Sequence, residues 1–203
     1  MARIDPASEL HGNGLHLRAY RADDAPALLA AVRESIDTVG RWLPWCHAQY
    51  GEADAHAWIA HCAEGWRDDE HYAFAVFDAA TATLCGAVGL NQRNRAHKFI
   101  NLGYWVRASR QREGIAVRAA ALIAAFGFER LKLARIEIVT TPDNLASQRV
   151  AAALGAVYEG VARNRIMVHG QAADALMYSL LPGDIRPVSA NLQGAAQTCS
   201  TSS

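Results

Sequence analysis

The chain has 203 residues, a length typical of one domain or of one domain with a tail. Hydrophobic residues make up 51% of it and charged residues 20%, so it can bury a core and a wholly disordered protein is excluded. The 20 Lys and Arg residues equal the 20 Asp and Glu residues in number. This balance argues against a protein that binds nucleic acid mainly through its net charge, and no nucleic-acid partner is expected.

The expected location follows from segments that the sequence does not show. No apolar run approaches the roughly 20 residues that span a bilayer. The first residues lack the apolar core of a secretion signal. The four cysteines form no CxxC pair, so we expect reduced thiols. His56 and His61 are five residues apart, unlike the four-residue spacing of zinc-binding helices, so no metal is expected. These features predict a cytoplasmic protein without a membrane partner.

Periodicity predicts a strand and two helices in the first third of the chain. Residues 15–20 alternate between apolar and polar side chains, as in a half-buried strand. Asp23 and Asp24 predict a helix start, and this helix is expected to run to about Val39. Residues 41–45 form an aromatic loop bounded by proline. Apolar side chains three, four and seven apart then indicate a helix over 52–68.

The rest of the chain predicts an α+β fold. The expected elements are three strands, a helix, a strand, a helix and a hairpin, at 71–78, 84–91, 99–107, 115 onward, 134–141, 144–154, 158–168 and 174–180. The consecutive strands have no helices between them, which favours a mixed, mostly antiparallel sheet flanked by helices. Residues 1–185 are expected to form a single domain, and the polar stretch 186–203 a flexible tail.

The segment 101–116 is the most informative for function. It is expected to be a strand, a short polar turn and the start of a long helix. Amides at a helix start have no intrahelical partners, and with the helix dipole they form an anion site suited to phosphates. Gly114 and Ala116 let the backbone approach a ligand closely, and Arg110 and Arg112 add positive charge. The alternative is an ordinary strand–turn–helix crossover with a solvated charge cluster.

The pattern Gln111-x-x-Gly114-x-Ala116 resembles the acyl-CoA pyrophosphate loop of the GNAT superfamily of N-acyltransferases. The stretch from Asn144 to Gly160 is similar to the second acyl-CoA segment of that family. Arg41-Trp-Leu-Pro-Trp45 and Gly103-Tyr-Trp-Val106 narrow the resemblance to the RimJ/RimL type, which acetylates the N-termini of ribosomal proteins. The similarity covers roughly residues 12–182.

This resemblance implies the GNAT fold, with splayed central parallel strands, and acetyl-CoA as co-substrate. In this fold the pantetheine arm pairs with the exposed backbone of one strand, and an Asn beside the other strand bonds it. That Asn can equally be a simple helix N-cap. The residues that the resemblance assigns to acetyl-CoA are Trp105, Val106, Gln111, Arg112, Gly114, Ile115, Ala116 and Asn144.

The resemblance also assigns two catalytic positions. Ser147 matches the serine that protonates the leaving thiolate in RimJ/RimL-type enzymes. Asn101 stands where some relatives carry a Glu that receives the amine proton, and an amide cannot act as that base. An exposed α-amine has a pKa near 7.7–8.0, so a backbone carbonyl or a water chain could suffice. His71 is the other candidate base.

The function implied is an acetyl-CoA-dependent N-acetyltransferase. Its expected acceptor is the N-terminal α-amine of a protein, of the ribosomal-protein type, which attacks directly in a ternary complex. Two alternatives stay open: transfer to a small amine such as a polyamine, antibiotic or amino acid, and a non-catalytic acyl-CoA-binding module. Trp42, Leu43, Trp45 and Trp58 would either line the acceptor groove or belong to the core, and the core is favoured for Trp58 and Trp66. Relatives of this type sometimes form homodimers, which the sequence leaves open.

Overall fold

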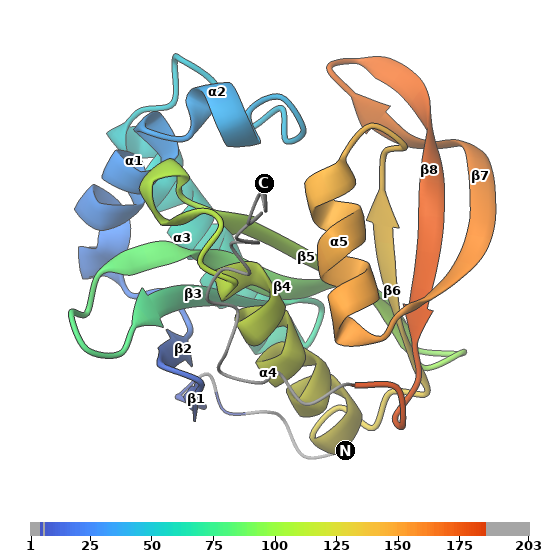
Figure 1. Cartoon of the computed structure of the whole chain (residues 1–203). Helices are drawn as coiled ribbons and strands as arrows, with labels where there is room; N and C mark the ends of the chain where they lie inside the picture. Colours follow the sequence, from blue (N-terminus) through green and yellow to red (C-terminus); the bar gives the residue numbers. More distant parts are fainter. Residues whose placement is uncertain (1–4, 6, 186–203) are drawn as a thin grey trace, which may run out of the picture.

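One mixed sheet runs through the described part of the chain, residue 5 and residues 7–185 of a computed structural model (Figure 1). Its strands are β1 (Leu10–Gly12), β2 (Leu15–Arg18), β3 (Tyr72–Asp78), β4 (Leu84–Asn94), β5 (Phe99–Val106), β6 (Arg135–Thr140), β7 (Val157–Val168) and β8 (Gln171–Leu180). In space they follow the order β1-β2-β3-β4-β5-β6-β8-β7. Only β5 and β6 pair in parallel, so the mixed, mostly antiparallel sheet is confirmed.

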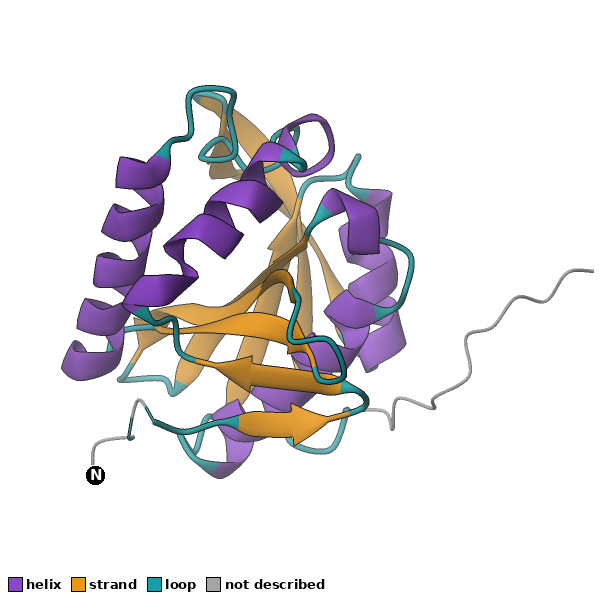
Figure 2. Ribbon diagram, turned by 90° about the vertical axis from the view of Figure 1, so that its left-hand side faces the viewer, coloured by secondary structure: helices purple, strands orange, loops and turns teal. Residues whose placement is uncertain are grey.

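Helices lie on both sides of this sheet (Figure 2). They are α1 (Ala25–Arg33), α2 (Ile36–Val39), α3 (Glu52–Asp68), α4 (Ile115–Glu129) and α5 (Leu145–Leu154), with 3₁₀ turns at Ala22–Asp24 and Ala108–Arg110. α4 and α5 cover one face. α1 and α3 pack on the part of the other face that β3 and β4 form.

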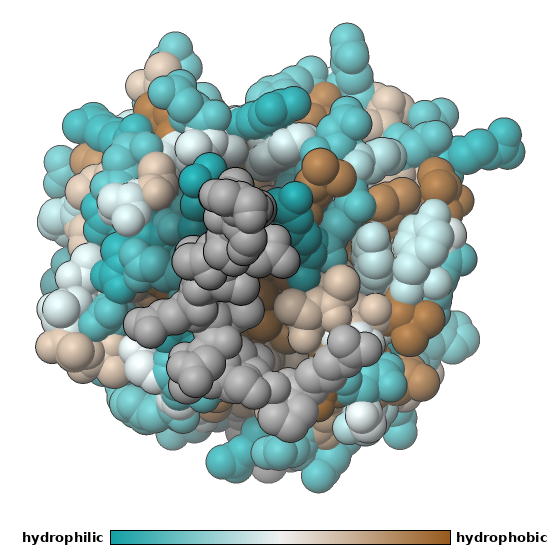
Figure 3. Space-filling model, viewed as in Figure 1, coloured by the Kyte–Doolittle hydropathy of each residue, from teal (hydrophilic) through white to brown (hydrophobic). Residues whose placement is uncertain are grey.

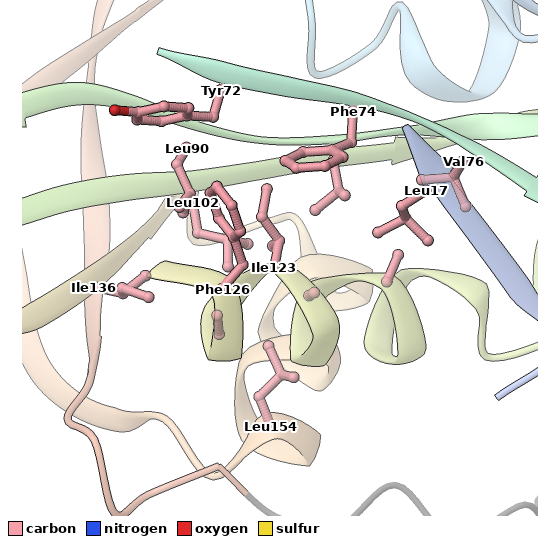
Figure 4. Close-up of a cluster of buried hydrophobic side chains, with 14 of the residues drawn as sticks. Leu17, Tyr72, Phe74, Val76, Leu90, Leu102, Ile123, Phe126, Ile136 and Leu154 are labelled. Atoms are coloured by element: carbon pink, nitrogen blue, oxygen red, sulfur yellow. The ribbon is translucent and has the colours of Figure 1, made fainter. Parts of the chain in front are cut away.

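The larger core cluster lies between the sheet and α4 (Figure 4). Phe126 of α4 meets the rings of Tyr72 and Phe74, with centroids 5.8 and 5.4 Å apart. On β6, Ile136 and Ile138 are buried in this cluster, which turns the residues between and beside them to the opposite face. The alternation therefore fixes which side chains of each strand face away from α4.

β5 and β6 separate after a short parallel contact. The register joins them at Phe99–Arg135, Ile100–Ile136 and Asn101–Glu137. Beyond these pairs β5 continues to Val106 along β4, whereas β6 continues to Thr140 along β8. The expected splayed strands are confirmed, and the edge of β5 over residues 102–106 has no strand beside it on the β6 side.

The structure differs from the sequence prediction at several element boundaries. The helix expected to run to about Val39 breaks at Glu34 and Ser35, where the Ser35 hydroxyl donates to the Ala31 carbonyl (2.6 Å). Such local side-chain bonds compete with the helical ladder. β1 is too short for its alternation to be recognised in sequence. The predicted tail, residues 186–203, lies outside the described residues. No helix within the described residues could cross a membrane.

Candidate active site

The turn between β5 and α4 presents a run of backbone amides without acceptors. The first backbone bond of α4 runs from the Arg118 amide to the Gly114 carbonyl (3.1 Å). Within residues 7–185, no group accepts a hydrogen bond from the amides of residues 112–117. The Ile115 side chain is buried in the core, so here it offers a ligand only its backbone. Such amides carry the positive end of the helix dipole and favour an anion.

The backbone of this turn directs its amides to a common side. Arg112 and Gly114, on either side of Glu113, are both left-handed, with φ of 67° and 71°. Alternating handedness of this kind forms a concave nest of amides that binds anions. A Cβ built on Gly114 would meet no atom within 4 Å, so the space beside this glycine is open. The predicted phosphate turn therefore has the conformation that an anion needs.

The charges beside the turn differ from the sequence expectation. Arg110 does not lend its charge to a ligand, because it binds Asp78 (2.8 Å) and Glu113 (2.9 Å). The Arg110 guanidinium holds the pKa of Asp78 well below its ordinary value. Arg112 forms no ion pair with a described residue, and Arg118 donates to backbone carbonyls, including that of Glu113 (3.1 Å). Arg112 and Arg118 are therefore the cations without a carboxylate partner near the turn.

Residues 107–109, just before the turn, are hydrogen-bonded to Glu34 and Ser35, which separate α1 from α2. The Glu34 carboxylate accepts hydrogen bonds from Arg107 Nε (2.8 Å) and Nη2 (2.6 Å), and from the Ser109 amide (3.1 Å) and hydroxyl (2.8 Å). The buried Ser35 hydroxyl accepts from the Ala108 amide (3.0 Å). These contacts, with Arg107 foremost, lower the pKa of Glu34 to about 2. No local sequence pattern predicts these contacts, because residues 34–35 and 107–109 lie far apart in the chain.

Three predicted donor-site residues, Trp105, Val106 and Gln111, lie at and just beyond the end of β5, but they offer different groups. The Gln111 side-chain amide donates to the Val106 carbonyl (3.1 Å) and to Thr38 Oγ1 (3.2 Å), so it bonds protein groups rather than facing a ligand. The Trp105 side chain is buried, and its ring meets Trp45 edge-on at 5.5 Å. The backbone edge, not these side chains, is what this segment presents to the split.

Across the split, α5 brings Asn144 and Ser147 toward β5. Asn144 Oδ1 accepts from the Ser147 amide (3.1 Å), so the N-cap role is confirmed for Asn144. Ser147 Oγ lies 2.9 Å from the hydroxyl of Tyr104, which also donates to the Ser147 carbonyl (3.1 Å). Burial raises the pKa of Tyr104 to about 12. Tyr104 stands in the Gly-Tyr-Trp motif that carried the resemblance, but the motif alone predicts no role for its hydroxyl.

Asn101 lies on the face of β5 opposite to Tyr104. Its Nδ2 donates to Asn91 Oδ1 (2.9 Å), whereas its own buried Oδ1 accepts no hydrogen bond within the described chain. His71, the alternative base, is packed against α3, where its ring stacks on His61 at 4.5 Å. Burial and His61 lower the pKa of His71. The buried Nε2 of His71 has no hydrogen-bond partner among the described residues, and neither Asn101 nor Ser147 is bonded to this ring.

A cleft of about 500 Å³ opens beside the start of α5. Its lining residues are Arg41, Trp42, Thr141, Pro142, Asp143, Asn164, Val168, Ala172, Ala173 and Asp174. They come from the loop after α2, the loop before α5 and the β7–β8 hairpin. Trp42 thus lines a groove, as one of the two interpretations expected, whereas Leu43 packs against the smaller core cluster.

Other reactive side chains lie outside this site. Cys46, Cys62 and Cys85 are buried, and burial raises the pKa of each thiol, which makes them poor nucleophiles. Within the described residues, Glu9, His11 and His16 form a group whose ligand atoms lie within 4.8 Å of one another. The two His rings are stacked at 6°. The Nε2 atoms of both rings face Glu9 Oε2, at 2.9 Å for His16 and 3.6 Å for His11.

Comparison with known proteins decides the family. A family model described as "Acetyltransferase (GNAT) domain" matches residues 14–157, more than half of the chain. The chain belongs to the GNAT acetyltransferase family. Two Bacillus subtilis (strain 168) proteins are similar to this GNAT protein along most of their length. YjcK, provisionally named an N-acetyltransferase, is 29% identical over 86% of this chain and 98% of its own. YdaF, provisionally named a ribosomal N-acetyltransferase, is 26% identical over 81% and 90%.

Solved structures agree with this GNAT assignment. A Vibrio cholerae protein, provisionally named a ribosomal-protein-serine acetyltransferase, superposes with a TM-score of 0.80 at 34% identity, covering 88% of this chain and all of that one. RimL, an acetyltransferase of ribosomal L7/L12 solved with coenzyme A, gives 0.78 at 20% identity over 86% and 98%, which shows the shared fold. The fold and the N-acetyltransferase class expected from the sequence are confirmed.

Proposed function

We propose that this GNAT protein transfers the acetyl group of acetyl-CoA to the N-terminal α-amine of a protein, with ribosomal proteins as the favoured class. The observation that carries the proposal is the anion-binding turn at residues 111–116, which adjoins the open edge of β5. Ser147, on the other side of that split, is hydrogen-bonded to Tyr104 of β5. The amine attacks directly while both substrates are bound.

The donor contacts are assigned by the chemistry of each group. The amides of residues 112–117, with Arg112 and Arg118 nearby, bind the pyrophosphate. The backbone of Trp105 and Val106 pairs with pantetheine along the edge that β6 leaves open. The side-chain nitrogen of Asn144 is available to donate to the same arm, since only its Oδ1 serves the cap. Gln111 contributes by holding the end of β5 rather than by touching the ligand.

Acetyl-CoA supplies the activated thioester, and Ser147 supplies the proton for the thiolate. As the nitrogen–carbon bond forms, the carbon–sulfur bond breaks, the amine loses one proton and the thiolate gains one. With a pKa raised to about 12, Tyr104 stays neutral at pH 7–8. Its hydroxyl can then hold the Ser147 hydroxyl in place, and solvent returns the proton that Ser147 gives up.

The cleft beside α5 supports a peptide acceptor. Its volume of about 500 Å³ exceeds what a small amine needs, and it is open at the surface. Asp143 and Asp174 give it carboxylates that favour a basic peptide. The names of YdaF and of the Vibrio cholerae protein point to ribosomal proteins as acceptors. Cytoplasmic location and the absence of a resident metal belong to the same proposal.

Two alternative functions predict different results in the same assay. A small-amine acetyltransferase would use the same donor site with a different acceptor. A non-catalytic acyl-CoA-binding module is motivated by Asn101, whose amide cannot take up the amine proton.

Thiol release from acetyl-CoA, measured with peptides, polyamines and amino acids, tests these functions. We expect turnover with peptides that have a free N-terminus, none with the same peptides acetylated at Nα, and about a 100-fold lower kcat for Ser147→Ala. CoA should raise the melting temperature of both proteins equally. Turnover of small amines alone would favour the first alternative, and CoA binding without any turnover the second. No thermal shift at millimolar CoA would overturn the donor site.

A homodimer is also part of the proposal. β7 lies at one edge of the sheet, and hydrophobic residues are visible on that side of the molecule (Figure 3). Its large exposed side chains are Val157, Tyr158, Val161 and Met167. An edge strand of this kind supports pairing between two copies, which light scattering coupled to size-exclusion chromatography would measure.

A further inference from the structure

A carboxylate lies beside Asn101 on the neighbouring strand. The parallel register pairs Asn101 of β5 with Glu137 of β6, and this is the last pair before the two strands separate. Residues in register on adjacent strands project to the same face of a sheet. Ile136 and Ile138, on either side of Glu137, are buried under α4 and α5, so Glu137 and Asn101 both face away from these helices.

The surroundings of Glu137 leave it as the excess negative charge of a small cluster. Glu137 Oε1 accepts from Arg135 Nε (3.0 Å). Arg135 donates its other two nitrogens to Glu159, at 2.6 and 2.5 Å, and Ser179 also donates to Glu159 (2.8 Å). One Arg therefore faces two carboxylates, which leaves a net charge of about −1. Glu137 Oε2 accepts no hydrogen bond from any residue of the described chain.

The position of Glu137 suits an acceptor amine. Its side chain is only 14% exposed, so its charge is weakly screened by solvent. Asn101 beside it has a buried Oδ1 without a donor. An ammonium or amine at the vertex of the split could donate to both oxygens at once. On the β4 side, the residue paired with Asn101 is Asn91, which is neutral and already hydrogen-bonded to Asn101.

We infer that Glu137 is the general base of this protein, in the role that some relatives give to a Glu at the position of Asn101. The inference rests on the proposed acetyl transfer to an amine. Asn101 Oδ1 accepts one N–H and orients the nitrogen, and Glu137 takes up the proton that the nitrogen loses as the new carbon–nitrogen bond forms. The thiolate is protonated separately by Ser147. The charged groups around Glu137 are Arg135 on its own strand and Glu159 on β7; its neighbours on β5 and β8, Asn101 and Ser179, are neutral.

The test compares pH–rate profiles of kcat for the wild type, Glu137→Gln, Glu137→Asp and Glu129→Gln, with acetyl-CoA and a free peptide N-terminus. Glu129 is an exposed glutamate of α4 and serves as the matched charge control. We expect Glu137→Gln to lower kcat about 100-fold at pH 7 and to recover partly toward pH 9, where the amine is already neutral. Glu137→Asp should keep the wild-type shape at a lower rate. The thermal shift with CoA should be unchanged in all four proteins.

Each outcome is decisive. A Glu137→Gln variant with the wild-type rate and profile would overturn the assignment of Glu137 and leave the acetyltransferase function intact. A loss of kcat that is equal at every pH, with Glu137→Asp equally affected, would show a structural role instead and also overturn it. A wild type that binds CoA yet acetylates no amine would overturn the proposed function, and the base assignment with it.

Discussion

Replacing Glu34 by Gln isolates the anchor that holds the phosphate turn. Glu34 joins the break between α1 and α2 to Arg107 and Ser109 through four hydrogen bonds, two of them from a guanidinium. Glutamine keeps the shape of the side chain but removes the charge and one acceptor oxygen. The folded protein should therefore be destabilised, and the turn should lose its fixed position.

The magnitude follows from the pKa of Glu34, which lies at about 2 against an ordinary value of 4.5. Each unit of pKa corresponds to 1.36 kcal/mol, so the interactions of the ionised carboxylate amount to about 3 kcal/mol at most. Because the side chain is partly exposed, screening reduces this to about 1–2 kcal/mol. The pKa is lowered on folding, so this stability is present above pH 4.5 and is lost as the pH falls from 4.5 toward 2.

Urea unfolding at pH 7 and pH 3 measures how much stability the Glu34 carboxylate contributes and in which direction that contribution changes with pH. At pH 7, Glu34→Gln should be less stable than the wild type by about 1–2 kcal/mol, and at pH 3 the gap should shrink to less than half of that. Glu129→Gln should match the wild type at both values. A gap below about 0.5 kcal/mol at pH 7, or one that does not change with pH, would refute the reasoning.

Three further substitutions probe the turn and the split. Gly114→Val places a side chain in the open space beside the amides, at a φ of 71°. It should lower the free energy of unfolding by about 1–2 kcal/mol and weaken CoA binding in calorimetry by more than about tenfold. An unchanged affinity for CoA would argue against the anion site. Tyr104→Phe removes the hydroxyl bonded to Ser147 and should lower kcat about tenfold or more with little change in CoA affinity, whereas an unchanged kcat would confine Tyr104 to packing. Asn144→Ala removes the cap of α5 and should lower the free energy of unfolding by about 1 kcal/mol, with Asn144→Ser as the variant that restores it.

The sequence predicted those parts of the molecule that depend on local pattern. The strand–turn–helix at residues 101–116 could be recognised because glycine and small residues follow a strand and precede an apolar helical face. The splayed strands came from the family resemblance, and the register of β5 and β6 confirms them.

What the sequence could not supply are the contacts between distant segments. Glu34 reaches Arg107 only after α1 has packed on the sheet. Arg110 was expected to add positive charge for a ligand, but in the folded chain it pairs with Asp78 of β3. No motif and no characteristic spacing in the sequence connects Glu137 with Asn101. Only the parallel register of β5 and β6 places the two residues side by side. Tyr104 was visible in a motif, but its partner on α5 was not.

Three register pairs are the whole of the ladder between β5 and β6. α4 packs across this line, since its core cluster includes side chains of β6 and α5 as well as of β4 and β5. Beyond the three pairs, Tyr104 and Ser147 also join β5 to α5. A ligand lying in the opening would act as an added strand along the part of β5 that β6 does not pair with. Amide hydrogen exchange along the far end of β5 should then slow when the ligand saturates the protein.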